Sequence, residues 1–293
     1  KLRVVNAMTR SFIFIVLLAS LGACKDPKAC CDQAPFDRAA MLRHYADNLI
    51  QPAYATLVDS LVAFRRDWAV FQQTPSAGSL QRLRTAWTNT YTLWQSANAY
   101  NFGPAGETGL RKGLVEEIGT FPANVAQIET FITAGDTTFN NFNRDTRGFL
   151  ALEYLLFDTQ NGSLLDAAPR RAYGQAVLNH LLQRAQEVKT AWGNYANTFA
   201  TANGTDVGSS TSQLYNEFVR SFEAAKNFKV GLPAGKRPGQ TQAEPQLVEA
   251  YYSGLSLSML KAHLAGIERI YFGVDANGQG DGLGFKAYVG AVV

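Results

Sequence analysis

The chain contains little cysteine, histidine and charge for its length. Its 293 residues include 3 Cys and 3 His, and 17% are charged against 46% hydrophobic. This much apolar material suffices for one large or two medium hydrophobic cores, which excludes an intrinsically disordered protein. The sequence contains no H-E-x-x-H and no G-x-S-x-G pattern, which removes the usual basis for a zinc peptidase or a serine hydrolase.

The chain also has no basic surplus that could attract nucleic acid. Lys and Arg exceed Asp and Glu by 27 − 24 = 3. All three surplus charges, Lys1, Arg3 and Arg10, precede residue 24, in a stretch without acids. Residues 24–293 therefore balance at 24 against 24, and we expect no nucleic-acid partner.

No hydrophobic run reaches the roughly 20 residues of a membrane-spanning helix. The longest, Ser11–Ala23, follows Arg10 and ends in Leu-Gly-Ala before Cys24. This layout is typical of a signal peptide and resembles a bacterial lipobox, in which the cysteine is lipidated. An ordinary secretory signal with a nearby cysteine is the alternative. We expect residues 1–23 to be upstream residues and signal, and Cys24 to anchor the protein to a bacterial envelope membrane, facing the periplasm or the cell surface.

Residues 24–35 read as a tether, and from residue 36 the apolar period is helical. Cys30 and Cys31 lie in the tether without metal-binding spacing, and we read them as solvated. The stripes of apolar residues at steps of three and four predict helices at about 57–71, 80–101, 123–133, 146–157, 170–202, 210–228 and 245–272. We expect Asp145 to cap the fourth of these, and the inner face of the last to consist of Leu257, Leu260, Leu264, Ile267 and Tyr271.

The class is therefore all-α, with two helical-bundle domains at 36–160 and 161–293. Similar endings at Tyr100–Gly103 and Ile270–Gly273 hint at a duplication. The apolar end at Val293 suggests that a final helix is missing from the second bundle. The four tryptophans, Trp68, Trp87, Trp94 and Trp192, fall on helical stripes and are expected in the core.

Five segments in order resemble the imelysin-like family of bacterial envelope proteins. They are Tyr45–Tyr54, Trp94–Pro104, Ile118–Glu129, Arg147–Phe157 and Ser253–Gly273. The resemblance implies two helical bundles, export, frequent lipidation and, in some relatives, a link to iron acquisition. The family was first classed as metallopeptidases.

The family signature, Gly-x-His-x-x-Glu, corresponds to Gly148, Leu150 and Glu153 here. Positions three apart share a helix face, so a His and a Glu could converge on one metal. Leucine at 150 removes that nitrogen, and Gly119 stands where relatives carry an acid. Glu153 is then a residual metal ligand or a polar anchor for a ligand, or else a structural carboxylate paired with Arg147 or Arg111.

The remaining candidates are weaker. His44 and Asp47, at i and i+3, could share a metal but also suit a solvated helix face. His180 and His263 read as structural or exposed. Asp275, Asn277 and Gln279 before Gly280 imitate part of a calcium loop, but the closing position holds Lys286 and the segment reads as a flexible loop.

The sequence thus favours an envelope lipoprotein that binds a ligand for iron or other metal acquisition, with a degenerate motif at Gly148, Leu150 and Glu153. The cofactor, if any, would be iron or another divalent metal, and the partners would be the membrane and envelope iron-uptake proteins. A metal-dependent peptidase, and a partner-binding lipoprotein with a decayed site, remain as alternatives.

Overall fold

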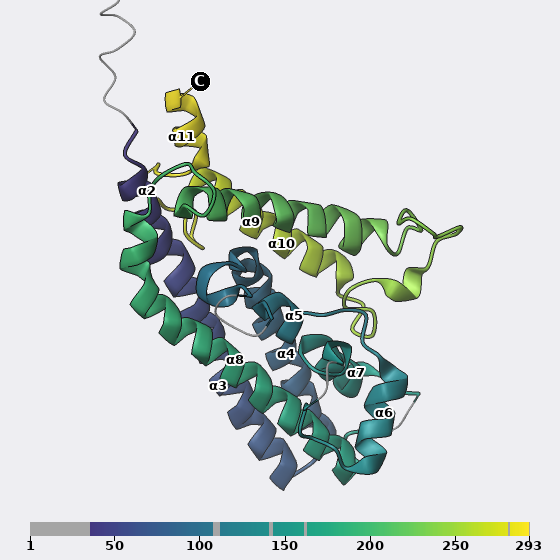
Figure 1. Ribbon diagram of the computed structural model, residues 1–293. Coiled ribbons are helices and arrows are strands. Elements are labelled where there is room, and N and C mark those ends of the chain that lie inside the picture. Colours follow the sequence, from purple (N-terminus) through teal and green to yellow (C-terminus); the bar gives the residue numbers. More distant parts are fainter. Residues whose placement is uncertain (1–35, 108–111, 141–142, 161–162, 281, 293) are drawn as a thin grey trace, which may run out of the picture. The chain divides into compact units, whose positions relative to one another are not determined.

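The computed structural model describes residues 36–107, 112–140, 143–160, 163–280 and 282–292 (Figure 1). Within these ranges all regular secondary structure is helical, as the sequence predicts. None of the helices in this part of the chain is long and apolar enough to cross a membrane. The predicted signal peptide and tether, with Cys24, Cys30 and Cys31, lie outside the described residues.

The first part of the fold is a long helical hairpin. Helix α2 (Arg38–His44) continues through the π-helical turn η3 (Tyr45–Ile50) into α3 (Gln51–Gln73), and α4 (Ala77–Ala97) returns beside α3. Ser76 and Ser79 form a capping box at the start of α4, where the sequence predicts a break. The predicted apolar stripe of α3, from Leu57 to Phe71, is fully buried.

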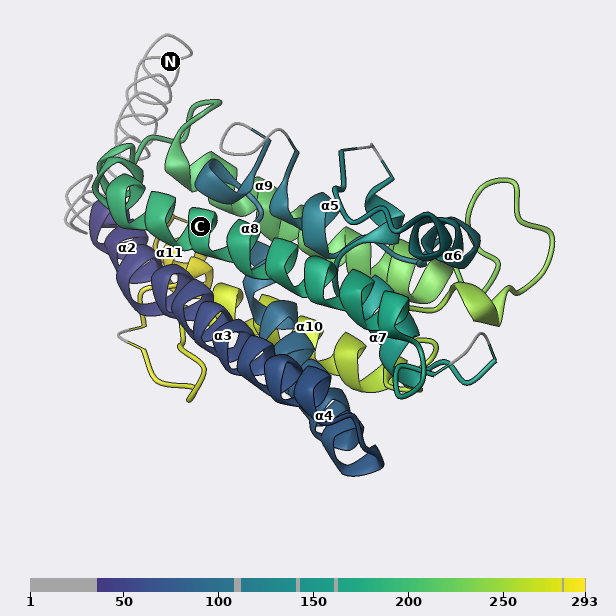
Figure 2. The same cartoon turned by 90° about the horizontal axis from the view of Figure 1, so that it is seen from below.

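Helix α8 (Ala168–Thr201) packs along α3, and the two run together in Figures 1 and 2. Gly174 makes this approach close, because a Cβ there would lie 2.4 Å from the buried ring of Trp68. All four tryptophans are buried, which confirms their predicted place in the core.

Short helices connect α4 to α8. They are η4 (Asn98–Tyr100), η5 (Gly103–Ala105), α5 (Leu114–Ile118), α6 (Val125–Ala134), η6 (Arg144–Thr146) and α7 (Phe149–Phe157). Helix α7 is buried from Phe149 to Leu156. The predicted cap at Asp145 is wrong: Asp145 belongs to η6, and Gly148, at φ 93°, is the N-cap of α7.

The last part contains α9 (Ser210–Ala224), the π-helical turn η7 (Ala225–Gly231), η8 (Pro245–Leu247), α10 (Ser256–Phe272) and α11 (Phe285–Val292). Figure 1 shows α9 and α10 side by side. The helix predicted from residue 245 begins only at Ser256, because the chain turns at Ala250 (φ 56°) and Gly254 (φ 69°). Helix α11 was not predicted.

The predicted inner face of α10 is largely wrong. Leu257 is 62% exposed, and Leu264 and Tyr271 are also exposed, whereas Met259, His263, Gly266, Ile267 and Ile270 are buried. The reason is Gly266, whose missing side chain brings α10 close to the α4 backbone, with Gln95 O only 3.3 Å from where a Cβ would lie. The close approach of the two backbones, and not the leucine stripe, therefore determines which face of α10 is buried.

Residues Asp37–Val293 form one compact unit. Helix α8, assigned from sequence to a second bundle, packs on α3 of the first. The contacts within the described ranges therefore show no separation near residue 160, and the division into duplicated bundles at 36–160 and 161–293 stays a prediction.

Candidate functional site

The motif carboxylate Glu153 is buried and already bonded. It is 1% exposed, and its Oε1 accepts hydrogen bonds from the backbone N–H of Ser253 at 2.8 Å and from Ser253 Oγ at 2.7 Å. Burial raises the pKa of Glu153 to about 7, against the lowering effect of these bonds. Glu153 therefore ties α7 to the turn that precedes α10, and neither Arg147 nor any other described residue forms an ion pair with it.

Gly148 has a structural reason to be glycine. Its φ of 93° is one that other residues rarely adopt, and a Cβ there would lie 2.5 Å from the carbonyl oxygen of Ile118. The close approach holds the start of α7 against the end of α5. The close approach at Gly148 is therefore made by the protein's own backbone.

The motif residues do not fit a metal ion. Leu150 and Glu153 border a cavity of about 40 Å³ with Phe121, Tyr251 and Tyr252. Leucine offers no lone pair, and no three His, Cys, Asp or Glu side chains are grouped to hold a metal within the described ranges. Leu150 offers no ligand, and Oε1 of Glu153 already accepts two hydrogen bonds from Ser253, so the predicted role of Glu153 as a ligand finds no support in this arrangement.

Arg147, one of the predicted partners of Glu153, instead pairs with Glu117. Glu117 receives Arg147 at 2.9 Å and Arg144 at 3.0 Å, and His180 Nε2 lies 3.6 Å away. Burial alone would raise the pKa of Glu117, but contact with His180 and the two guanidinium groups together lower it to about 2. This cluster joins α5, η6 and α8 and gives His180 a structural place. Arg111 lies outside the described residues.

A buried polar network lies beside the motif helix. Lys229 of η7 donates to Gln95 Oε1 at 2.6 Å and contacts both carboxylate oxygens of Glu249, at 3.0 and 2.8 Å. Glu249 also accepts from Tyr91 at 2.5 Å and Gln95 Nε2 at 3.2 Å. Burial lowers the pKa of Lys229, and the neighbouring carboxylate opposes that shift.

The network forms part of the wall of a cavity of about 390 Å³. Residues from α4, η4, α5, α9, η7 and α10 line it, together with the Gly119–Phe121 segment and Glu249. Phe121 lies on both this cavity and the small one at Glu153. The ring of Trp94 fills the space beside Gly119, where a Cβ would lie 3.0 Å from it. This cavity is the strongest candidate site in the described part of the molecule, since it is concave and combines apolar walls with several buried polar side chains.

Two titratable groups on the cavity have strongly shifted pKa values. Glu217 is 4% exposed, and burial raises its pKa to about 8 although Arg220 lies 3.3 Å away. Burial, reinforced by the charge of Lys229, lowers the pKa of His263 well below its usual range. His263 Nε2 shares a hydrogen bond of 2.7 Å with Ser221 Oγ. His263 is buried, one of the two outcomes the sequence allowed.

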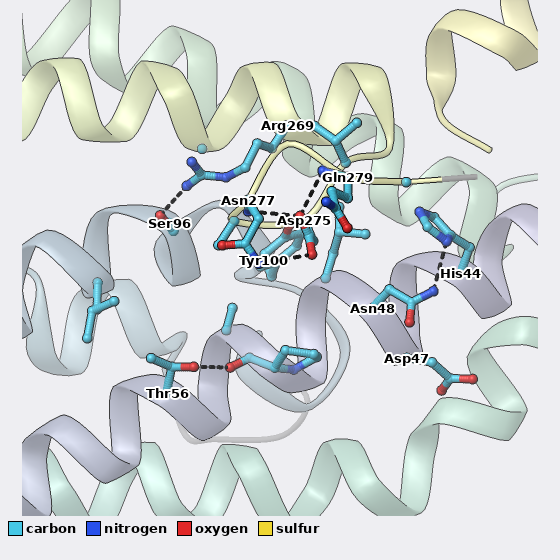
Figure 3. A pocket seen from close by; sticks show the side chains of 18 residues that line it. His44, Asp47, Asn48, Thr56, Ser96, Tyr100, Arg269, Asp275, Asn277 and Gln279 are labelled. Atoms are coloured by element: carbon cyan, nitrogen blue, oxygen red, sulfur yellow. Dashed lines mark hydrogen bonds between the residues drawn. The ribbon is translucent and has the colours of Figure 1, made fainter. Parts of the chain in front are cut away.

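The remaining candidates meet in a different hollow, of about 640 Å³, shown in Figure 3. His44 and Asp47 lie on it with Asp275, Asn277 and Gln279. His44 uses both ring nitrogens, bonding Gly273 O at 2.7 Å and Asn48 at 2.9 Å. Asp275 accepts from the backbone N–H groups of Asn277 and Gln279, at 2.8 and 2.9 Å. The Asp275 carboxylate therefore binds backbone groups of its own loop. These contacts do not support metal binding by the His44–Asp47 pair or by the calcium-like loop.

Comparison with known proteins settles the family. The sequence model of the family described as Imelysin matches residues 50–292. The chain belongs to the imelysin family. A curated relative in sequence is iron-regulated protein A of Synechococcus elongatus, 23% identical over 248 residues, which covers 81% of this chain and 65% of the relative. The chain thus spans somewhat less than two thirds of that relative's length.

Two solved structures share the imelysin fold. One, from Parabacteroides distasonis, is named as an iron-regulated protein A precursor, with a TM-score of 0.73, 18% identity and coverage of 89% of this chain and 81% of that one. The other is an imelysin-like protein of Psychrobacter arcticum, with a TM-score of 0.70, 22% identity and coverage of 88% and 78%. At these identities the likeness supports the fold alone.

Sequence reasoning missed Glu217, Lys229 and Glu249, which line the 390 Å³ cavity. Glu217 is the clearest case, because α9 buries a mainly polar face, Ser210, Thr211, Leu214, Glu217 and Ser221, and exposes Tyr215 and Phe222. Apolar periodicity favours the opposite face. A signal did exist for Glu249, the one acid within the largely apolar stretch Leu247–Tyr252.

Proposed function

We propose that this imelysin-family protein binds a ligand in the 390 Å³ cavity beside α7 and does not transform it. The observation that carries the proposal is the buried Lys229–Glu249 pair on the cavity wall, held by Tyr91 and Gln95. Because Lys229 and Glu249 neutralise each other and are hydrogen-bonded, they preorganise the wall and offer no obvious nucleophile or general base.

The motif residues hold in place two segments next to the cavity. Gly148 permits the contact between α5 and α7, and Glu153 holds the turn at Ser253. Glu249, which lies on the cavity, comes four residues before that turn. We therefore assign Glu153 and Gly148 to positioning of the site, and Leu150 to the apolar side of the small cavity.

The physiological setting we propose is iron acquisition at the bacterial envelope. It is supported by the relative named iron-regulated protein A, and by the signal-like residues 11–23 that end before Cys24. Lipid attachment at Cys24 would hold the protein at a membrane, where envelope iron-uptake proteins are the partners we propose.

A thermal-shift experiment tests ligand binding in the cavity. Small-molecule extract from iron-limited bacteria should raise the melting temperature of the wild-type chain, because a ligand bound only to the folded state stabilises it. Ala224→Phe, which adds a ring inside the cavity, should lose most of the shift. Ala126→Phe, the same change on the exposed side of α6, is the control. Equal shifts in all three proteins would contradict the proposal.

A peptide-cleavage assay tests the absence of catalysis. The wild-type chain with Zn²⁺ or Fe²⁺ should not cleave a quenched fluorescent peptide library above the rate of the Glu153→Gln variant. Cleavage that a chelator stops and that Glu153→Gln abolishes would show a metallopeptidase instead.

A further inference from the structure

We propose that the cavity of about 390 Å³ binds an uncharged, mainly apolar molecule with a hydrogen-bond acceptor, such as an aromatic ketone; this rests on the binding role proposed above. The observation that carries the proposal is the indole N–H of Trp94. Trp94 is 2% exposed and lines the cavity. No described residue accepts a hydrogen bond from its Nε1, and protein atoms do not enclose this nitrogen. The cavity therefore presents an open donor to a ligand.

The other three tryptophans differ from Trp94 in this respect. Trp87 Nε1 donates to a backbone carbonyl oxygen at 2.8 Å. The indole nitrogens of Trp68 and Trp192 have no partner but are enclosed in the core, where no ligand can reach them. Trp94 Nε1 lies beside Gly119, where an added Cβ would be 3.1 Å from it. The absence of a side chain at Gly119 therefore keeps this donor accessible.

Packing fixes the direction of the donor. The Trp94 ring stacks on Phe149 of α7, with the ring centroids 6.0 Å apart. A purely apolar ligand would remove solvent from the N–H and leave the donor unpaired, which costs free energy. A ligand that places an acceptor there avoids this cost, so the site should discriminate against molecules that lack one.

The ionic groups on the wall neutralise one another, so we expect the ligand to carry no charge. Lys229 and Glu249 are both buried and lie 2.8 Å apart. Burial raises the pKa of Glu217 to about 8, so this carboxyl group is mostly protonated at pH 7. The other two charged residues of the lining, Arg220 and Glu116, are exposed and of opposite sign. A charge buried with the ligand would therefore lose its hydration without gaining a counter-charge.

The open surface of the wall is mostly apolar. Val115, Phe121, Ala224 and Phe228 contribute to it. Phe228 is 45% exposed, and the guanidinium group of Arg237 lies over its ring, 4.6 Å from the centroid. The protein's own cation thus already occupies a face of this ring. A flat apolar ring system is the ligand body that suits these walls.

Ligand-detected NMR on the full chain tests the proposal with four naphthalene probes that are substituted at the same ring position. They are the methyl ketone, the isopropenyl compound, the carboxylate and the methylammonium. The ketone and the isopropenyl compound have the same shape and differ in the acceptor oxygen. The ketone should bind about fivefold more tightly than the isopropenyl compound, as expected for one net hydrogen bond. It should bind at least tenfold more tightly than either charged probe. Equal or tighter binding of any of the other three would overturn the proposal.

Trp94→Phe removes the N–H and keeps an aromatic ring, so the ketone and the isopropenyl compound should bind this variant equally. Trp192→Phe, the same change at an enclosed indole, should keep the fivefold preference and is the matched control. In the wild type, the ketone should also shift the indole N–H resonance of Trp94 more than the isopropenyl compound does. A preference that persists in Trp94→Phe, or an unshifted Trp94 resonance, would contradict the assigned contact.

Ala224→Phe should abolish binding of the ketone, because the added ring fills the cavity. No binding of any probe to the wild type would overturn the proposed ligand class. An extract-induced shift that is lost in Ala224→Phe would then still leave the proposed binding function standing. Failure of both experiments would remove both.

Discussion

At the scale of single residues, Glu153 and Glu217 should make stability depend on pH in the neutral range. Their folded pKa values, about 7 and about 8, lie above the ordinary value of 4.5. The folded chain then binds more protons than the unfolded one between pH 4.5 and 8. Stability is therefore highest below pH 4.5 as far as these groups are concerned, and falls as pH rises through 7 and 8, by up to about 1.4 kcal/mol per pH unit for each group.

The measurement is urea unfolding between pH 5 and pH 9 for the wild type and for Glu153→Gln with Glu217→Gln. The unfolding free energy of the double variant should fall much less with rising pH than that of the wild type. An equal fall in both proteins would mean that other titratable groups cause it.

Glu117 should have the opposite effect on the pH dependence of stability. Its folded pKa of about 2 lies below the ordinary value of 4.5, so its stabilising effect is present above pH 4.5 and is lost as pH falls toward 2. Glu117→Gln should destabilise the protein at pH 7 and much less at pH 3. Thermal unfolding at the two pH values would reveal this, and equal losses would contradict the ion-pair role.

Gly148→Ala should destabilise the fold by about 2–4 kcal/mol, because it combines an unfavourable φ with overlap at Ile118 O. Gly135→Ala is a matched control. It has a φ of 67° but nothing within 4 Å of the added Cβ, so it should cost about 1 kcal/mol from backbone strain alone. Equal losses in denaturant unfolding would mean that the contact at Ile118 is unimportant.

At the scale of elements, the approach of α8 to α3 depends on Gly174. Gly174→Ala gains helix propensity of up to about 1 kcal/mol, but its Cβ would overlap Trp68, and overpacking of a buried ring costs about 1–3 kcal/mol. We expect a net loss. Gly193→Ala in the same helix meets nothing within 4 Å and should stabilise the protein. Denaturant midpoints that move in the same direction would contradict this packing.

The turn η7 brings Lys229 to Glu249. Lys229→Met leaves a buried carboxylate without its ion partner and should cost about 3–5 kcal/mol in unfolding free energy. Lys229→Met with Glu249→Gln should recover part of the loss, since no net charge then remains. A double variant as unstable as the sum of both single variants would argue against a direct pair.

The sequence predicts the elements well where a side-chain stripe alone determines packing. The helices around Leu57–Phe71 and Val177–Phe199 are examples, since their apolar residues meet a broad core. It fails where backbone geometry decides, as at Gly148 and Gly266. It also fails for α9, whose buried polar face faces the cavity and breaks the usual pattern. The candidate site itself, built by Lys229, Glu249 and Glu217, arises from contacts distant in sequence that no local pattern encodes.

At the scale of the whole molecule, the protein is an imelysin-family chain whose surplus positive charge lies within its first 23 residues. If Cys24 is lipidated, the Cys24→Ser variant should move from the membrane fraction to the soluble fraction of a bacterial host. Mass spectrometry of the N-terminal peptide would find a diacylglyceryl group on the wild type alone. An unmodified Cys24 would leave the ordinary secretory signal as the explanation.

The central claim is that recognition belongs to the cavity and not to a metal ion at the motif. Elemental analysis of the purified full chain, beside Glu153→Gln, tests it most directly after exposure to Fe²⁺ and Zn²⁺. The account predicts that neither protein retains stoichiometric metal after dialysis, because Leu150 offers no ligand and Glu153 is held by Ser253. About one metal ion per wild-type chain, lost in Glu153→Gln, would contradict it.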